Sequence, residues 1–87
     1  MKKHTKIYFK YFDYIADDFI PCECCGNRAV DIHHIIARGM GGSEKDNINN
    51  LMAVCRTCHI KYGDKTQYLE WLKSIHQEKV KEQAAGI

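Results

Sequence analysis

The tetrapeptide Asp31-Ile32-His33-His34 lies between two C-x-x-C pairs, Cys22/Cys25 and Cys55/Cys58, in a chain of 87 residues. Each pair supplies two thiolates from one turn, and two such pairs complete the tetrahedral ligand set that structural zinc prefers. The stretch 26–54 between the pairs is longer than in a simple zinc ribbon, and it has the length of a strand, a loop and a second strand. The spacing therefore predicts one structural zinc ion that fastens a β-hairpin.

A fifth cysteine, Cys24, lies inside the first pair. Cys24 could replace Cys25 as a ligand, but the C-x-x-C-G register favours Cys25, because Gly26 can take the positive φ of the turn. The spacing disfavours five unrelated buried cysteines. No secretory signal and no long apolar run is found in the sequence. We therefore expect zinc rather than disulfides, in a reducing, cytoplasmic setting with no membrane segment.

The bulk composition predicts one small domain, 1–87, with 45% hydrophobic residues and a formal net charge of +2. A chain of this length rarely has a large core, which agrees with a metal staple. The net charge is too small to prove a nucleic-acid partner, but the stretch 25–63 is mildly basic. Its basic side chains are candidates for contacts to backbone phosphates, and they are Arg38, Lys45, Arg56 and Lys61.

Apolar spacing predicts an α+β fold. A polar and frayed segment, 1–6, precedes an expected amphipathic helix at 7–19 whose apolar stripe is Tyr8, Tyr11, Phe12, Ile15 and Phe19. We interpret that stripe as core packing rather than as a platform for bases. The β-prone stretch 29–36 predicts a strand, and Leu51–Val54 predicts a second strand antiparallel to it. Between the strands, 37–47 contains three glycines and predicts a flexible loop.

Two helices are expected after the second strand. Arg56–Tyr62 predicts a short helix that begins inside the second cysteine pair and ends at Gly63. A longer helix is predicted at 65–83, with Asp64 as its N-cap and Gln67 as the capping-box partner. The apolar face of that helix consists of Tyr68, Leu69, Trp71, Leu72, Ile75 and Val80. His4 and His76 lie outside every motif, and the sequence assigns them no role.

Several motifs follow one another in a recognisable order, and they are Cys-x-x-Cys-Gly, Asp31-Ile32-His33-His34-Ile35, Gly41-Gly42, Asn50-Leu51 and Cys55-Arg56-Thr57-Cys58-His59. This order resembles the HNH endonuclease family, and more narrowly the small stand-alone HNH nucleases of bacteria and their phages. The resemblance covers 22–63. It implies the ββα-metal motif, in which an antiparallel hairpin packs on one helix with a divalent ion between them.

The resemblance also implies a role for each matching residue. His33 and His59 would bind the catalytic ion, His34 would be the general base, and Asn50 would fix the loop that aims His34. Asp31 shares a strand face with His33 and is expected as a further ligand or as a hydrogen-bonding partner of His33. Packed or surface histidines, and an asparagine that serves only a turn, are the structural alternatives.

One position departs from the family pattern. Some members carry another histidine four residues after the one that matches His59, where this chain has Gly63. The ion would then have only two or three protein ligands. Mg²⁺, Mn²⁺, Ni²⁺ and Zn²⁺ all stay open as the catalytic ion.

The function predicted is metal-dependent hydrolysis of DNA phosphodiester bonds by an HNH endonuclease, as a monomer or homodimer and with weak sequence preference. One alternative is a catalytically silent, zinc-stapled module that binds nucleic acid or protein. Another is a structural zinc domain that recruits a partner through the helix carrying Trp71. The complete set of histidines and Asn50 favours the nuclease, because a binding module has no need of a base.

Overall fold

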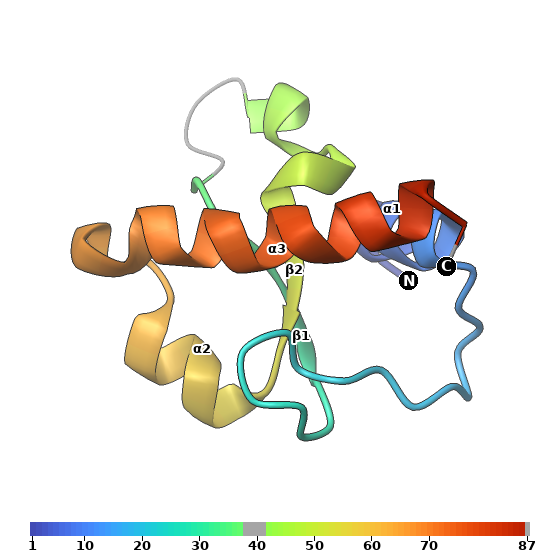
Figure 1. Cartoon of the computed structure of the whole chain (residues 1–87), viewed down its shortest axis with the longest axis horizontal. Helices are drawn as coiled ribbons and strands as arrows, with labels where there is room; N and C mark the ends of the chain where they lie inside the picture. The colour runs from blue at the N-terminus through green and yellow to red at the C-terminus, as the bar shows by residue number, and fades with distance from the viewer. Residues whose placement is uncertain (38–41, 87) are drawn as a thin grey trace.

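The computed structural model describes residues 1–37 and 42–86. Within them an antiparallel β-hairpin, β1 (Asp31–His34) and β2 (Leu51–Val54), lies at the centre of an α+β fold (Figure 1). Around it are the helices α1 (Lys3–Phe12), α2 (Arg56–Tyr62) and α3 (Leu69–Ala84), with 3₁₀ turns η1 (Gly42–Lys45), η2 (Ile48–Asn50) and η3 (Thr66–Tyr68). None of these helices combines the length and the apolar character needed to cross a membrane.

All four side chains of β2 are buried, and they alternate between two hydrophobic clusters. The first cluster contains Leu51 and Ala53 together with Tyr8, Phe12 and Ile20. The second contains Met52 and Val54 together with Cys22, Ile35, Cys55, Cys58 and Leu72. Successive strand residues point to opposite faces, so one face of the hairpin packs on α1 and the other packs on α3, which crosses β2 in Figure 1.

The same alternation separates the two adjacent histidines of β1. His33 is opposite Met52 in the strand register, and its ring centroid lies 4.7 Å from that of His59 in α2. His34 is opposite Leu51, and its ring centroid lies 4.7 Å from that of His4 in α1. As the period of two predicts, the two side chains face opposite sides of the hairpin.

The predicted bounds of β2 and α2 are confirmed, and so is the antiparallel pairing. β1 is shorter at both ends than the strand predicted at 29–36. At its C-terminal end the backbone of Ile36 bonds to the side chain of Asn50 instead of continuing the ladder. The loop predicted at 37–47 falls partly on 38–41, outside the described residues. From Gly42 to Lys45 it forms the 3₁₀ turn η1.

The N-terminal helix differs from the one predicted at 7–19. It starts at Lys3, within the segment expected to be frayed, and it ends at Phe12. Asp13 takes the left-handed conformation with φ 61°, a conformation that asparagine and aspartate adopt more readily than most residues but still rarely. The expected core packing is therefore wrong for Ile15 and Phe19 beyond this stop, which are 66% and 53% exposed.

The C-terminal helix is also different at its start. The segment predicted to be helical from residue 65 first forms η3, and α3 follows from Leu69. Asp64 does not cap it, because Asp64 has a φ of 58° and the α-helix begins after Tyr68 without a side-chain cap. On the predicted apolar face Leu72 is buried, whereas Trp71 is 43% exposed.

A buried polar network connects α3 with the first cysteine pair and with α1. His76 is fully buried, and its Nδ1 atom lies 2.8 Å from Oε1 of Glu23. The Nε2 atom of His76 donates to the carbonyl oxygen of Ile48 in η2. The other carboxylate oxygen of Glu23 accepts from the hydroxyl of Tyr8 at 2.6 Å and from the N–H of Ala53 at 3.1 Å. The pair of Glu23 and His76 thus joins five segments of the chain, which are α1, the first cysteine pair, η2, β2 and α3.

Candidate functional site

The four cysteines of the two C-x-x-C pairs meet at one end of the hairpin. The Sγ atoms of Cys22, Cys25, Cys55 and Cys58 all lie within 4.8 Å of one another. Those of Cys25 and Cys55 are 3.7 Å apart. A tetrahedron with Zn–S bonds of about 2.3 Å has an edge of about 3.8 Å, so this spacing fits a structural zinc ion.

Cys24 stays outside that group, as the C-x-x-C-G register predicts. Its side chain is half-buried against the second hydrophobic cluster, and burial raises the pKa of the Cys24 thiol to about 12. Burial opposes ionisation of Cys22 as well, but the backbone N–H groups of Cys55, Cys25 and Cys24 outweigh it and lower the pKa of Cys22 to about 7. The position of Cys24 outside the four-cysteine group, rather than the acidity of its thiol, therefore favours Cys25 as the ligand.

A second group of donors, the His33 cluster, consists of His33 from β1, His59 from α2 and Asp64 just beyond α2. One ligand atom from each of these side chains lies within 4.8 Å of the other two. Among the described residues, the Nε2 atom of His33 is buried without a hydrogen-bond partner. Such an atom is costly unless something binds it. Two imidazoles and a carboxylate fit a divalent ion, and that ion would satisfy the buried nitrogen.

The protonation state of His33 agrees with a ligand role. Burial lowers the pKa of His33 below its ordinary value, and the neighbouring His59 lowers it further. The ring is therefore neutral near pH 7, and a neutral imidazole is the form that coordinates a metal.

Asp31 makes a hydrogen bond to His59, a partner that the sequence did not predict. The Nδ1 atom of His59 lies 3.0 Å from Oδ2 of Asp31, which leaves Nε2 of His59 as the ligand atom. Oδ1 of Asp31 lies 3.5 Å from Nη2 of Arg56. Asp31 and His33 share a strand face and stand about 7 Å apart along it, and the ring of His59 lies within hydrogen-bonding distance of Asp31.

Asp64 is a candidate ligand that the sequence did not predict, and it directly follows Gly63. A Cβ atom on Gly63 would lie 2.5 Å from the carbonyl oxygen of His59 and 3.3 Å from Cε1 of His33. It would also lie 2.7 Å from Cδ2 of His59, so a histidine at this position would crowd the backbone and the ring of His59. The chain instead has a carboxylate at the following residue. The acidic residue next to Gly63, the position that departs from the family pattern, is the sequence signal that could have identified this candidate ligand.

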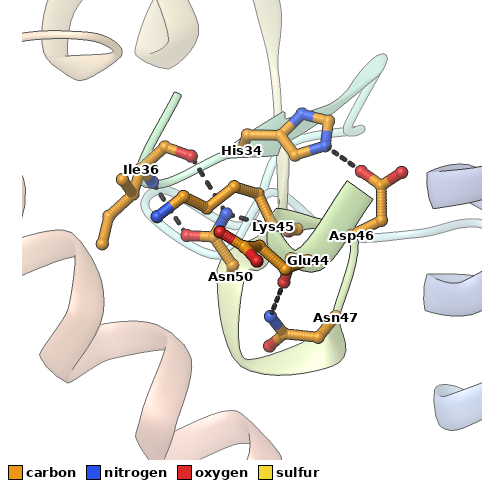
Figure 2. Close-up of polar contacts among 7 residues, drawn as sticks. All are labelled: His34, Ile36, Glu44, Lys45, Asp46, Asn47 and Asn50. Carbon is orange, nitrogen blue, oxygen red and sulfur yellow. Dashed lines mark hydrogen bonds and ion pairs between the residues drawn. The ribbon is translucent and has the colours of Figure 1, made fainter. Parts of the chain in front are cut away.

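A third group, the His34 cluster, lies on the opposite face of the hairpin and consists of His34, Asp46 and His4. Nε2 of His34 lies 2.6 Å from Oδ1 of Asp46, and their side chains are 15% and 2% exposed (Figure 2). An ionised carboxylate only accepts hydrogen bonds, so in the neutral form of the His34 ring Nε2 carries the hydrogen and Nδ1 has the lone pair. Neither Asp46 nor His4 was assigned a role from the sequence.

Asn50 joins the end of β1 to the segment before Asp46. Its Oδ1 accepts from the N–H of Ile36 at 2.8 Å, and its Nδ2 donates to the carbonyl oxygens of Ile36 and Lys45, each at 3.0 Å (Figure 2). Asn50 is 8% exposed. These three bonds exceed what a simple turn residue makes, and they fix Asp46 relative to β1.

The basic residues expected to contact DNA phosphates differ in their exposure and in their partners. Arg56 has a side chain 67% exposed and pairs with Asp31. Lys61 is exposed and its Nζ lies 5.3 Å from the centroid of the Tyr62 ring. Lys45 is half-buried beside Asn50. Arg38 lies outside the described residues.

Comparison with known proteins adds one match. A family model described as HNH endonuclease matches residues 22–65, about half of the chain, and this span contains both cysteine pairs, Asn50 and the complete His33 cluster. No curated protein and no solved structure gives a match.

Proposed function

Since this chain belongs to the HNH endonuclease family, we propose that it is a metal-dependent endonuclease that hydrolyses DNA phosphodiester bonds. In this proposal the domain spans 1–87, the four cysteines hold structural zinc, and the His33 cluster holds the catalytic ion. His34 is the general base.

The observation that carries the proposal is the position of His33. Its buried Nε2 has no partner among the described side chains and backbone groups, and it lies in a group with His59 and Asp64. The adjacent His34 faces the other side of the same strand. A protein that only bound a partner would have no reason to keep a buried imidazole unsatisfied.

A divalent ion bound by the His33 cluster would stabilise the negative charge that develops on the phosphate during hydrolysis. Asp31 holds the ring of His59 so that its Nε2 faces the cluster. Asp64 adds the anionic oxygen that Mg²⁺ and Mn²⁺ prefer, while the imidazoles also suit Ni²⁺ and Zn²⁺.

His34 takes a proton from the water that attacks phosphorus. The hydrogen bond from its Nε2 to Asp46 fixes the tautomer, so the lone pair of Nδ1 is available to accept that proton. The imidazolium that forms is stabilised by the carboxylate of Asp46, which lies 2.6 Å away. Asn50 keeps the two segments in register through its bonds to Ile36 and Lys45.

DNA would be held mainly through its phosphates. The candidates are basic side chains of the stretch 25–63, and they are Arg38, Lys45, Arg56 and Lys61. These few cations support binding by charge with weak sequence preference.

The test is cleavage of supercoiled plasmid by zinc-loaded protein, after EDTA and after addition of Mg²⁺, Mn²⁺ or Ni²⁺. We expect cleavage that requires an added ion. His34→Ala should lower the rate by about 10²–10⁴-fold and keep the affinity for the added ion, whereas His33→Ala should lose both.

Zinc content is measured in every sample, so that loss of the cysteine-bound ion is not mistaken for loss of catalysis. Wild-type rates in His34→Ala, or an absence of cleavage with every ion in protein that retains its zinc, would contradict the proposal and favour a silent binding module.

A further inference from the structure

The His34 cluster contains more than a base and its partner. His4 comes from the first turn of α1, His34 from β1 and Asp46 from the segment between η1 and η2. One ligand atom from each lies within 4.8 Å of the other two. The His4 and His34 rings are tilted by 59° with centroids 4.7 Å apart.

The three side chains of the His34 cluster provide enough donor atoms to bind a metal ion. Two imidazoles and one carboxylate match the three protein ligands of many zinc sites, with further positions left for water. Imidazole nitrogen favours Zn²⁺, Ni²⁺ and Cu²⁺ over Mg²⁺, which prefers oxygen ligands. The Asp46 side chain is buried and that of His34 is largely buried, at 2% and 15% exposure, which lowers the cost of ordering the ligands.

The site is separate from the His33 cluster. The two clusters lie on opposite faces of the hairpin, because His33 and His34 are consecutive residues of one strand. They share no ligand.

We propose that His4, His34 and Asp46 form an inhibitory site for a borderline transition-metal ion such as Zn²⁺. The inhibition rests on the proposed function of His34 as a base. When an ion binds, the 2.6 Å hydrogen bond between Nε2 of His34 and Oδ1 of Asp46 is replaced by a bond from each atom to the ion. The hydrogen of Nε2 is lost to solvent, and the neutral ring takes up a hydrogen on Nδ1. Both ring nitrogens are occupied, so His34 has no lone pair left to accept a proton from water.

Binding is tested without activity. Protein is loaded with zinc at the cysteines, and the His33 cluster is removed by His59→Ala. Calorimetric titration with Zn²⁺ should then show one further site. His4→Phe in that background keeps an aromatic ring against His34 but removes the ligand, and it should weaken this site by about tenfold or more. Lys3→Gln, an exposed change in the same turn, is the matched control.

Inhibition is tested in protein with an intact His33 cluster. Plasmid cleavage in Mg²⁺ is titrated with Zn²⁺, and each rate is normalised to the same variant without added zinc. The zinc concentration for half inhibition should rise by about tenfold or more in His4→Phe and stay at the wild-type value in Lys3→Gln.

The outcomes separate the two proposals. Equal zinc affinity with and without His4→Phe, or equal half-inhibition, overturns the inhibitory site even if cleavage is normal. Absence of cleavage with every ion overturns the nuclease, and the calorimetric comparison still decides whether the three side chains bind zinc.

Discussion

The Nδ1 atom of His59 in α2 lies 3.0 Å from the Oδ2 atom of Asp31 at the start of β1. A carboxylate that accepts from one ring nitrogen sets the tautomer and turns the other nitrogen toward the ligand position. The orientation of a helix side chain is thus set by a strand side chain, and the hairpin and α2 must be docked before the His33 cluster exists.

Asp31→Asn should therefore weaken the binding of the catalytic ion without removing a ligand. We expect its affinity for Mn²⁺ to fall by about 10–100-fold, measured by calorimetry on zinc-loaded protein. Arg56→Gln removes the other partner of Asp31, 3.5 Å away, and is the matched control. Because Arg56 is largely exposed, its loss should leave Mn²⁺ affinity close to wild type. Equal losses in the two variants would contradict the assigned role of Asp31.

Asp64→Asn tests the ligand supplied in place of a further histidine. Asparagine tolerates the φ of 58° at this position, so the substitution removes charge and keeps the backbone. Mn²⁺ affinity should drop by roughly tenfold or more, while zinc content stays at one per chain. If Asp64→Asn binds Mn²⁺ as wild type does, the ion is held by His33 and His59 alone.

Gly63 and Asp64 also show where sequence reasoning reached its limit. The cysteine register, β2 and α2 were predicted correctly because cysteine spacing and a fully apolar strand are local signals. Asp64 was read as an N-cap because aspartate before a helix usually is one. Asp64 lies beside His33 and His59 because Gly63 approaches these two residues closely. Such an approach depends on three-dimensional packing and not on the spacing of residues in the sequence.

The helix ends and the buried network were unpredictable for a similar reason. The apolar period in the N-terminal segment continues through Ile15 and Phe19. It therefore does not predict that Asp13 adopts the left-handed backbone conformation that ends α1. His76 carries no motif, yet it is fully buried against Glu23. Asp46 lies in a polar loop, and only the three-dimensional fold brings it to His34.

Serine substitution of the cysteines tests the zinc site. Cys22→Ser, Cys25→Ser, Cys55→Ser and Cys58→Ser should each lose zinc, whose binding to such sites contributes about 10 kcal/mol or more to folding. Cys24→Ser is the matched control, because Cys24 lies beside the group but outside it. It should keep one zinc per chain and cost about 1 kcal/mol or less. Zinc is counted by elemental analysis, and zinc loss in Cys24→Ser alone would reverse the register.

DNA binding should depend strongly on salt. With few basic residues at the site, we expect log affinity to fall with log salt with a slope of about three to five. Lys45→Gln should reduce that slope by about one on each of two unrelated duplexes, and Arg38→Gln by the same amount. The measurement uses His34→Ala protein so that the DNA stays intact. A preference for one duplex that persists at high salt would point to base readout instead.

The burial of Tyr8 predicts that the folded protein loses stability at alkaline pH. Burial, and after it the Glu23 carboxylate, raises the pKa of Tyr8 above its ordinary value. A tyrosine in the unfolded chain ionises near pH 10, so the unfolded state releases this proton first. Stability is therefore complete below about pH 10 and falls as the pH rises above it. The stability advantage of wild type over Tyr8→Phe in urea unfolding should shrink over that range, and an advantage that stays constant would contradict the burial of this hydroxyl.

The burial of β2 on both faces has a consequence for how the protein unfolds. Leu51 and Ala53 complete the packing against α1, and Met52 and Val54 complete the packing against the cysteines and α3. Neither half can open without exposing a strand that the other half needs. Chelation of the zinc should therefore melt α1, which contributes no cysteine, in the same transition as α2, and no partly folded fragment should accumulate.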